Sequence, residues 1–173
     1  TKLKANQICR LGIGRTFQIP KPLDEMTVLE NVLVGALCRH GDMDVAREKA
    51  RAVANLCALN KYVDELVGSM NVIQKKRVEI ARALATEPKL LLLDETMAGL
   101  TNAERKEAVE LIRQINAEGI AILTIEHVMD VVMTVSSRVV VIHSGKLLVE
   151  GTPEEVTSNQ EVINAYLGGG AHA

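Results

Sequence analysis

Four consecutive leucines at residues 90–93, followed directly by Asp94 and Glu95, limit the possible folds of this chain more than any other feature. A short run without polar residues is expected of a strand that is buried on both faces of a parallel sheet. Two further apolar runs, rich in β-branched residues, occupy residues 120–125 and 139–142. The chain is therefore expected to contain several buried strands of this kind.

Helical patterns separate and precede these runs. A capping box of Thr101 and Glu104 opens a helix after the leucine run, and Gly119 is a suitable stop for it. A second box, Thr152 with Glu155, opens the C-terminal helices. Strand, helix and strand in this order predict an α/β fold with a parallel sheet.

Three regions follow from these patterns. Apolar residues recur at helical spacing from about residue 27 to residue 86. We expect a helical lobe at about residues 19–86, inserted before an α/β half at residues 87–150, with terminal helices at residues 151–173. The chain begins with Thr1 rather than Met, so a trimmed or partial product is expected.

Charge and aromatic content argue against a nucleic-acid partner. The 173 residues carry 20 Lys and Arg against 22 Asp and Glu, and no basic stripe is present. Only Phe17, Tyr62 and Tyr166 could stack on bases. The three cysteines form no CxxC pair, which favours a reducing, cytoplasmic setting. No run approaches the roughly 18 apolar residues of a membrane span.

Asp94 and Glu95 are the first candidates for chemistry. Open α/β sheets place their ligands at the carboxyl ends of parallel strands, where this pair is predicted to lie. Asp94 could hold Mg²⁺, partly through water, and Glu95 could orient or deprotonate an attacking water. Asp and Glu also follow strands as helix caps, so a structural role stays open at this point.

His127 is the second candidate, because it follows the apolar run at residues 120–125. A histidine just beyond a strand could contact a phosphate or the attacking water. A lone histidine is more often an ordinary surface residue. A role at the phosphate is favoured only because His127 follows the acidic pair in the sequence.

The order of these motifs resembles the ABC-transporter ATPases. Asp94 and Glu95 are similar to their Walker B pair, residues 98–101 to their D-loop, and His127 to their switch histidine. Residues 15–18, RTFQ, match their Q-loop, and residues 74–84 match the helix after their LSGGQ signature. The resemblance implies a P-loop NTPase-like fold, with a partial parallel sheet and an inserted helical lobe.

Several stretches are similar to the ATP-binding subunit of branched-chain amino acid uptake systems, among them MTVLENVLVGAL, IEHVMDVVM and EGTPEEV. Close relatives that take up urea or amides would look much the same. Such a subunit hydrolyses ATP with Mg²⁺ and pairs with a second ATP-binding subunit. Its helical lobe contacts the membrane subunits, so the resemblance implies a cytoplasmic protein peripheral to the inner face of the cell membrane. ABC-type DNA-repair or translation factors are a weaker match, since no coiled-coil insertion or second cassette is present.

The resemblance also assigns roles. Gln18 would sense Mg²⁺ and the γ-phosphate, Asp94 would bind the metal, and Glu95 and His127 would be catalytic. Asn71, Ile73, Gln74 and Thr101 would contact nucleotide through the signature and the D-loop. Asn71 and Ile73 replace the serine and the last glycine of LSGGQ, and a branched Ile73 is expected to crowd the phosphate. Lys75, Lys76 and Arg77 are expected to be a solvated helix face.

The P-loop of ABC-transporter ATPases, which holds the β- and γ-phosphates of ATP, has the pattern GxxxxGK[ST]. No such string occurs in these residues. The chain alone is therefore expected neither to bind ATP tightly nor to hydrolyse it. An alternative is a non-catalytic pseudo-ATPase or docking module for the membrane subunits. Without a P-loop strand, the strand at residues 90–93 is expected to lack a neighbour and to promote self-association.

Overall fold

The computed structural model describes residues 2–166 of the chain. Two compact units are present, Thr1–Glu126 and His127–Ala173, each with its own sheet and helices. The first unit contains most of the predicted site residues. The three-part division expected from the sequence stays a prediction.

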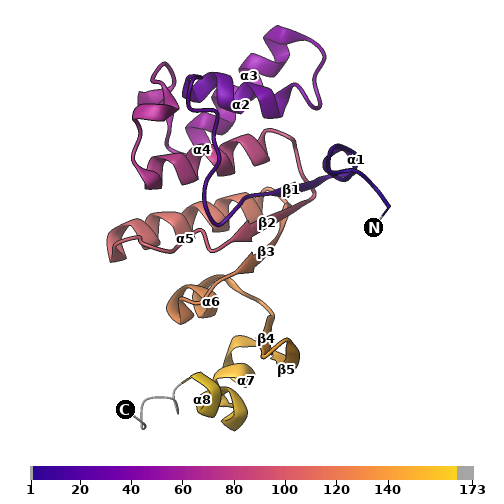
Figure 1. Ribbon diagram of the computed structural model, residues 1–173, viewed down its shortest axis with the longest axis vertical. Coiled ribbons are helices and arrows are strands. Elements are labelled where there is room, and N and C mark those ends of the chain that lie inside the picture. Colours follow the sequence, from indigo (N-terminus) through magenta and orange to yellow (C-terminus); the bar gives the residue numbers. More distant parts are fainter. Residues whose placement is uncertain (1, 167–173) are drawn as a thin grey trace. The chain divides into compact units, whose positions relative to one another are not determined.

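The first unit is built on a three-stranded parallel sheet in the order β1-β2-β3. Its strands are β1 (Ile13–Arg15), β2 (Leu90–Asp94) and β3 (Ala121–Ile125), as Figure 1 shows. Leu91 and Leu93 of β2 are 0% and 1% exposed, as expected of a central strand. The predicted α/β class and parallel sheet are confirmed.

The expectation that the leucine strand lacks a neighbour is wrong. β2 pairs with β1 on one side and with β3 on the other. β1 could not be recognised from local pattern, because it is only three residues long and contains Gly14, so that it is a strand only through its pairing with β2. Among the described residues, β3 ends this sheet, and its Leu123 and Ile125 are 53% and 56% exposed.

Four helices of the first unit begin at side-chain caps, of which the sequence predicted the one at Thr101. Thr27, Asp42, Asn71 and Thr101 each accept a backbone N–H from the first turn of the following helix. The helices are α1 (Ala5–Arg10), α2 (Val28–Ala36), α3 (Met43–Leu56), α4 (Val72–Leu84) and α5 (Asn102–Ala117), with short 3₁₀ turns at Asn60–Tyr62 and Val67–Ser69.

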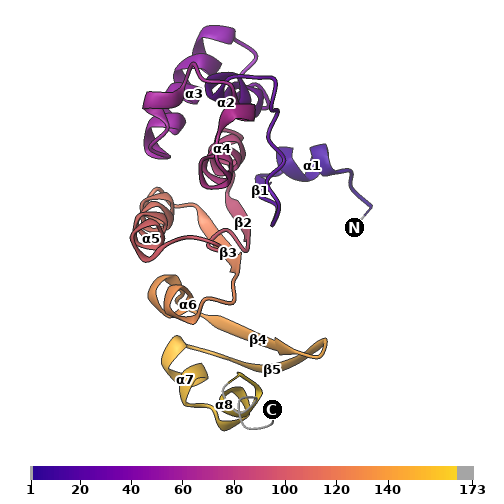
Figure 2. The ribbon, with the colours of Figure 1, turned by 60° about the vertical axis from the view of Figure 1, so that its left-hand side comes forward.

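Helices α2, α3 and α4 pack on one another, and α5 lies alongside β2 and β3 in both Figure 1 and Figure 2. Helices α2 and α4 approach each other closely at Gly35 of α2, where a Cβ atom would collide with the carbonyl oxygen of Arg82 in α4. The buried face of α3 is made of alanines, which lets α2 approach closely: Ala46, Ala50 and Ala54 are all 0% exposed.

The second unit contains a two-stranded antiparallel sheet of β4 (Val139–His143) and β5 (Lys146–Gly151). We expected residues 139–142 to form another strand of the parallel kind, and this is wrong. Ser144 and Gly145 have φ of 49° and 75°, which closes a two-residue hairpin and turns β5 back against β4. Only one face is buried, so that Val139 and Val141 are buried while Val140 and Ile142 are exposed.

The helices of the second unit are α6 (Met129–Val135), α7 (Pro153–Ser158) and α8 (Gln160–Tyr166). The predicted start of α7 is confirmed, because Thr152 caps it and accepts from the backbone N–H of Glu155. Val156 of α7 and Val162 of α8 complete a small core with β4. In the part of the chain that the structure describes, no helix combines the length and the apolar character needed to cross a membrane. The end of the predicted C-terminal region, residues 167–173, lies outside the described residues.

Candidate functional site

The candidate site follows from the direction of the three parallel strands. Their carboxyl ends meet at one edge of the sheet, which is where open α/β sheets place ligands. Gln18 lies in the loop after β1, Asp94 and Glu95 end β2, and Glu126 directly follows β3. Segments far apart in the sequence therefore deliver polar side chains to the same edge.

Gln18 and Glu95 are in direct contact. The Gln18 amide Nε2 donates to Oε2 of the Glu95 carboxylate over 2.7 Å. Glu95 itself has a φ of 45°, in the left-handed region that residues other than glycine rarely adopt. The structure thus brings together two residues that the resemblance had assigned separately to the Q-loop and the Walker B pair, and it holds Glu95 in an uncommon backbone conformation.

Asp94 is held by groups from β1. The Arg15 guanidinium Nη2 lies 3.4 Å from Oδ2 of Asp94, and the Asp94 backbone N–H donates to Oγ1 of Thr16 over 3.3 Å. Arg15 also lies over the Phe17 ring, 5.2 Å from its centroid. The sequence interpretation gave Arg15 no role of its own. Its place in the RTFQ string, two positions before the single phenylalanine, was the signal available.

The loop that carries Gln18 is anchored to helix α4. The two carboxylate oxygens of Glu79 accept the backbone N–H groups of Phe17 and Lys21 over 3.2 Å and 3.3 Å. Glu79 is only 3% exposed, so these bonds satisfy a charge that would otherwise be costly to bury. This anchor was missed, because a glutamate in a helix pattern gives no sign of its distant partners.

The signature residues form a second group at the start of α4. Asn71 caps the helix by accepting the Gln74 backbone N–H over 2.9 Å, and the Gln74 side chain accepts the Asn71 N–H over 3.1 Å. This reciprocal capping box fixes both side chains. With Ile73 they line a hollow of about 270 Å³. Gln18, Asp94 and Glu95 are not among its lining residues.

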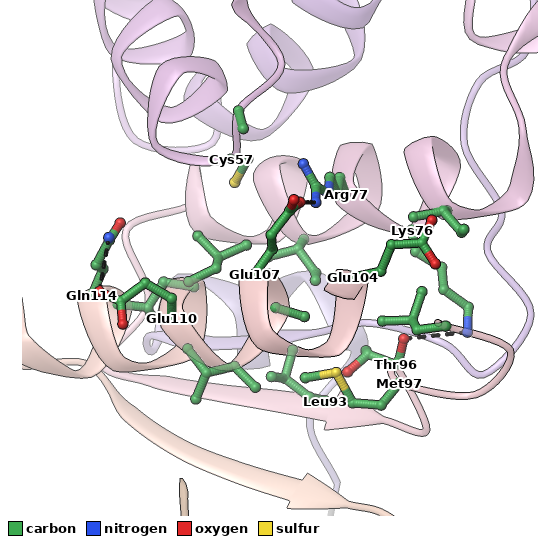
Figure 3. A pocket seen from close by; sticks show the side chains of 18 of the residues that line it. Cys57, Lys76, Arg77, Leu93, Thr96, Met97, Glu104, Glu107, Glu110 and Gln114 are labelled. Carbon is green, nitrogen blue, oxygen red and sulfur yellow. Dashed lines mark hydrogen bonds and ion pairs between the residues drawn. The ribbon is translucent and has the colours of Figure 1, made fainter. Parts of the chain in front are cut away.

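Ile73 also lines a larger cavity of about 410 Å³ between α4 and α5 (Figure 3). Its walls are largely apolar, and two pairs of polar side chains lie at its edge, with Arg77 bound to Glu107 and Gln114 donating to Glu110. Burial raises the pKa of the Cys57 thiol in this cavity to about 12, so this cysteine is a packing group rather than a nucleophile.

Thr101 and His127 are placed differently from the others. The Thr101 hydroxyl donates to the Glu104 carboxylate over 2.7 Å and accepts the Glu104 N–H, so it is engaged in capping α5. His127 is the first residue of the second unit. The catalytic role expected for His127 and the nucleotide contact expected for Thr101 stay predictions.

The expectation that Lys75, Lys76 and Arg77 form a solvated helix face is wrong for Lys76. Lys76 is only 9% exposed, and its ammonium donates to the carbonyl oxygens of Glu95, Thr96 and Ala98. The helical period was a usable signal, because Lys76 lies four residues before the buried Ile80 and thus on the same helix face.

A metal ion at this edge would bind few protein ligands. Within residues 2–166, no cluster of three or more His, Cys, Asp or Glu side chains has a metal-binding arrangement. The Asp94 carboxylate and the Gln18 amide oxygen are hard oxygen donors. Such a sparse set suits Mg²⁺, which usually keeps several waters and binds substrate phosphates as well.

Family models match both ends of the chain. The model described as "ABC transporter" matches residues 1–98, and that described as "Branched-chain amino acid ATP-binding cassette transporter" matches residues 146–172. Among curated proteins, the high-affinity branched-chain amino acid transport ATP-binding protein LivG of Salmonella typhimurium is 36% identical over 96% of this chain and 71% of its own length. BraF of Pseudomonas aeruginosa, which carries the same description, has the same identity and coverage.

Solved structures agree in fold. An ATP-binding cassette of an ABC transporter in its ADP conformation superposes with a TM-score of 0.82 and 32% identity, over 97% of this chain and 73% of that one. A nucleotide-free ATP-binding cassette from an ABC transporter gives a TM-score of 0.79 and 31% identity, over 96% and 72%.

Proposed function

Because this chain belongs to the ABC transporter family of ATP-binding proteins, we propose that it serves as the ATP-binding subunit of an importer for branched-chain amino acids. The observation that carries the proposal is the contact between Gln18 and Glu95, beside Asp94, at the carboxyl edge of the sheet. The similarity to LivG and BraF along almost the whole chain supports the substrate class.

Asp94 and Gln18 are the residues proposed to hold Mg²⁺, partly through water. Gln18 donates to Glu95 through Nε2, which leaves its carbonyl Oε1 as the atom that faces a cation. The Arg15 guanidinium offsets the Asp94 charge in the structure described here. When bound, Mg²⁺ would neutralise negative charge that develops on the phosphates during hydrolysis.

Glu95 is the proposed general base. Its carboxylate accepts a hydrogen bond from Gln18, which orients it at the edge where a γ-phosphate would lie. An oriented carboxylate can position the attacking water and accept its proton. His127 is proposed to contact the γ-phosphate or the same water. Thr101, in the segment like the D-loop, is proposed to lie at the nucleotide.

The resemblance to ABC-transporter ATPases implies a dimer that associates with membrane subunits. We therefore infer that Asn71, Ile73 and Gln74 face a nucleotide held by a second ATP-binding subunit, with the helix N-terminus directed at phosphate. The helical lobe is proposed to contact the membrane subunits. These contacts would place the protein in the cytoplasm, peripheral to the inner face of the cell membrane.

The test is uptake of labelled leucine by cells in which Glu95→Gln replaces the natural residue. Loss of the base should reduce ATP-driven leucine uptake by about 10²-fold or more. Glutamate uptake in the same cells serves as the control and should not change. Normal leucine uptake both in this variant and after deletion of the gene would refute the proposal.

A second candidate, a non-catalytic docking module, is favoured by the signature substitutions at Asn71 and Ile73. The same experiment separates the two. A docking module predicts that deletion abolishes leucine uptake, whereas Glu95→Gln leaves it unchanged.

A further inference from the structure

We propose that Lys76 and Glu126 form a clamp that positions the turn at residues 95–98, and with it the Glu95 carboxylate. Lys76 is on α4, the helix of the signature group, and Glu126 directly follows β3. The clamp would make both residues positioning residues for hydrolysis. This functional meaning rests on the role of Glu95 proposed above, whereas the clamp itself can be tested without it.

Lys76 holds the turn through its carbonyl groups. Its Nζ donates to the oxygens of Ala98, Thr96 and Glu95 over 2.8 Å, 3.3 Å and 3.4 Å. An ammonium has three protons to donate, so this set of acceptors matches its capacity. Lysine is rarely buried unless it is paired, and Lys76 is 9% exposed. The side chain is therefore committed to this turn.

Glu126 holds the same turn through an amide. Its Oε1 accepts the backbone N–H of Met97 over 2.9 Å. The carbonyl groups of the turn thus bind the ammonium of Lys76 on α4, and one of its N–H groups binds the carboxylate of Glu126 after β3. Desolvation lowers the pKa of Lys76, while the charges of Glu126 and Glu95 act in the opposite direction. These two carboxylates favour the charged form of the lysine.

Glu95 itself shows why such a clamp is needed. Its φ of 45° is a conformation that L side chains adopt only when their surroundings impose it. Its backbone N–H is fixed by the Ile125 carbonyl of β3 over 2.9 Å, and its carbonyl is fixed by Lys76. Strand β3 therefore restrains this residue through its N–H group, and the clamp restrains it through its carbonyl group.

The clamp also connects two groups of the candidate site. Lys76 lies in the second turn of α4, just after the capping box of Asn71 and Gln74. A displacement at the start of α4 would reach the Glu95 turn through one side chain. Lys76 thus connects the signature group, through its hydrogen bond to the Glu95 carbonyl, to the contact between Gln18 and Glu95.

The test uses hydrogen exchange of the purified chain, read at the backbone amides of Met97 and Ala98. Lys76→Met keeps the aliphatic volume and removes all three hydrogen bonds. We expect exchange at these amides to accelerate by about tenfold or more, because bonds from a charged donor are lost. Lys76→Arg, which keeps the charge, should restore part of the protection. The control is Lys106→Met, which removes an exposed lysine of α5.

A second measurement separates positioning from packing. The side-chain amide resonance of Gln18 reports its bond to Glu95, and it should shift in Lys76→Met and in Glu126→Ala but not in Lys106→Met. If Lys76→Met fails to fold, Glu126→Ala takes its place in the exchange measurement, because it removes the acceptor of the Met97 N–H. Unchanged Met97 exchange and an unchanged Gln18 resonance in the folded variants would overturn the clamp.

These readouts are independent of transport. If leucine uptake proves insensitive to Glu95→Gln while the Lys76 variants still loosen the turn, the proposed function fails and the clamp stands. If uptake depends on Glu95 and the turn is unaffected by the Lys76 variants, the clamp fails and the function stands.

Discussion

The side-chain amide of Gln18 donates to the Glu95 carboxylate across 2.7 Å, although the two residues are 77 positions apart in the chain. Parallel pairing of β1 with β2 makes this possible, because both strands end at the same edge. A neutral amide bound to the proposed base orients its carboxylate. We therefore expect substitution of Gln18 to affect function more than it affects the stability of the fold.

We predict that Gln18→Ala lowers leucine uptake by about tenfold or more, because the Glu95 carboxylate loses its orienting donor. The free energy of unfolding, measured in urea, should change by less than about 1 kcal/mol, since the bond is exposed. Gln114→Ala is the matched control, because Gln114 donates to Glu110 over 3.2 Å on the surface of α5. A loss of uptake in both variants would contradict a specific role for Gln18.

The contact between α2 and α4 predicts a large effect of Gly35→Ala. The added methyl group would meet the Arg82 carbonyl oxygen and lie 3.0 Å from Cβ of Ala85. A backbone carbonyl cannot turn aside without moving its helix, so the clash outweighs the helix propensity that alanine brings. Urea unfolding should show a loss of about 1–3 kcal/mol.

Gly41→Ala provides the comparison for that experiment. No atom lies within 4 Å of a Cβ built at Gly41, so its stability should stay within about 0.5 kcal/mol of the natural chain. Equal losses at the two positions would show that the α2–α4 contact is looser than the structure indicates.

The cysteines are predicted to differ in their reactivity toward iodoacetamide. Burial raises the Cys57 pKa from its ordinary 9.0 to about 12, which lowers the thiolate fraction at pH 8 by about a thousandfold. Desolvation also raises the pKa of Cys38, but this thiol is exposed. Mass spectrometry of the alkylated native protein should find Cys38 modified well before Cys57. Rapid labelling of Cys57 in the folded protein would be inconsistent with the packing around it.

Local patterns predicted much of this fold. The leucine run, the capping box at Thr101 and the box at Thr152 depend on neighbouring residues only, and the structure has β2, α5 and α7 at those places. The order of the Q-loop, signature and Walker B motifs also identified Gln18 and Glu95, which the structure joins by a hydrogen bond.

Features that depend on distant partners were missed. β1 is a strand because β2 lies beside it, and Ile13, Gly14 and Arg15 alone carry little strand signal. Lys76 and Glu79 look like ordinary polar residues of a helix until the turn at residues 95–98 and the loop at residues 16–21 are seen to supply their partners. A charged side chain can be buried only where hydrogen-bond partners surround it. The positions of those partners depend on the tertiary structure and cannot be read from neighbouring residues in the sequence.

The cap of α5 gives a prediction with a defined pH dependence. The side-chain hydrogen bond from Thr101, and then the backbone N–H of Thr101, lower the pKa of Glu104 below its ordinary 4.5. A lowered folded-state pKa means that the carboxylate stabilises the fold above the unfolded pKa. That contribution is lost as the pH falls through the lower, folded value.

Thr101→Ala should therefore lower Tm at pH 7 by roughly 2–4 °C, through loss of the cap. The loss should become smaller as the pH falls through the lowered pKa of Glu104, because the protonated carboxyl no longer adds to the cap. Glu104→Gln should remove this pH dependence while keeping a neutral capping box, whereas Glu118→Gln, in an exposed position at the other end of α5, should leave it unchanged. A Thr101→Ala effect that is equal at pH 7 and pH 3 would show that the hydroxyl stabilises the helix without the Glu104 charge.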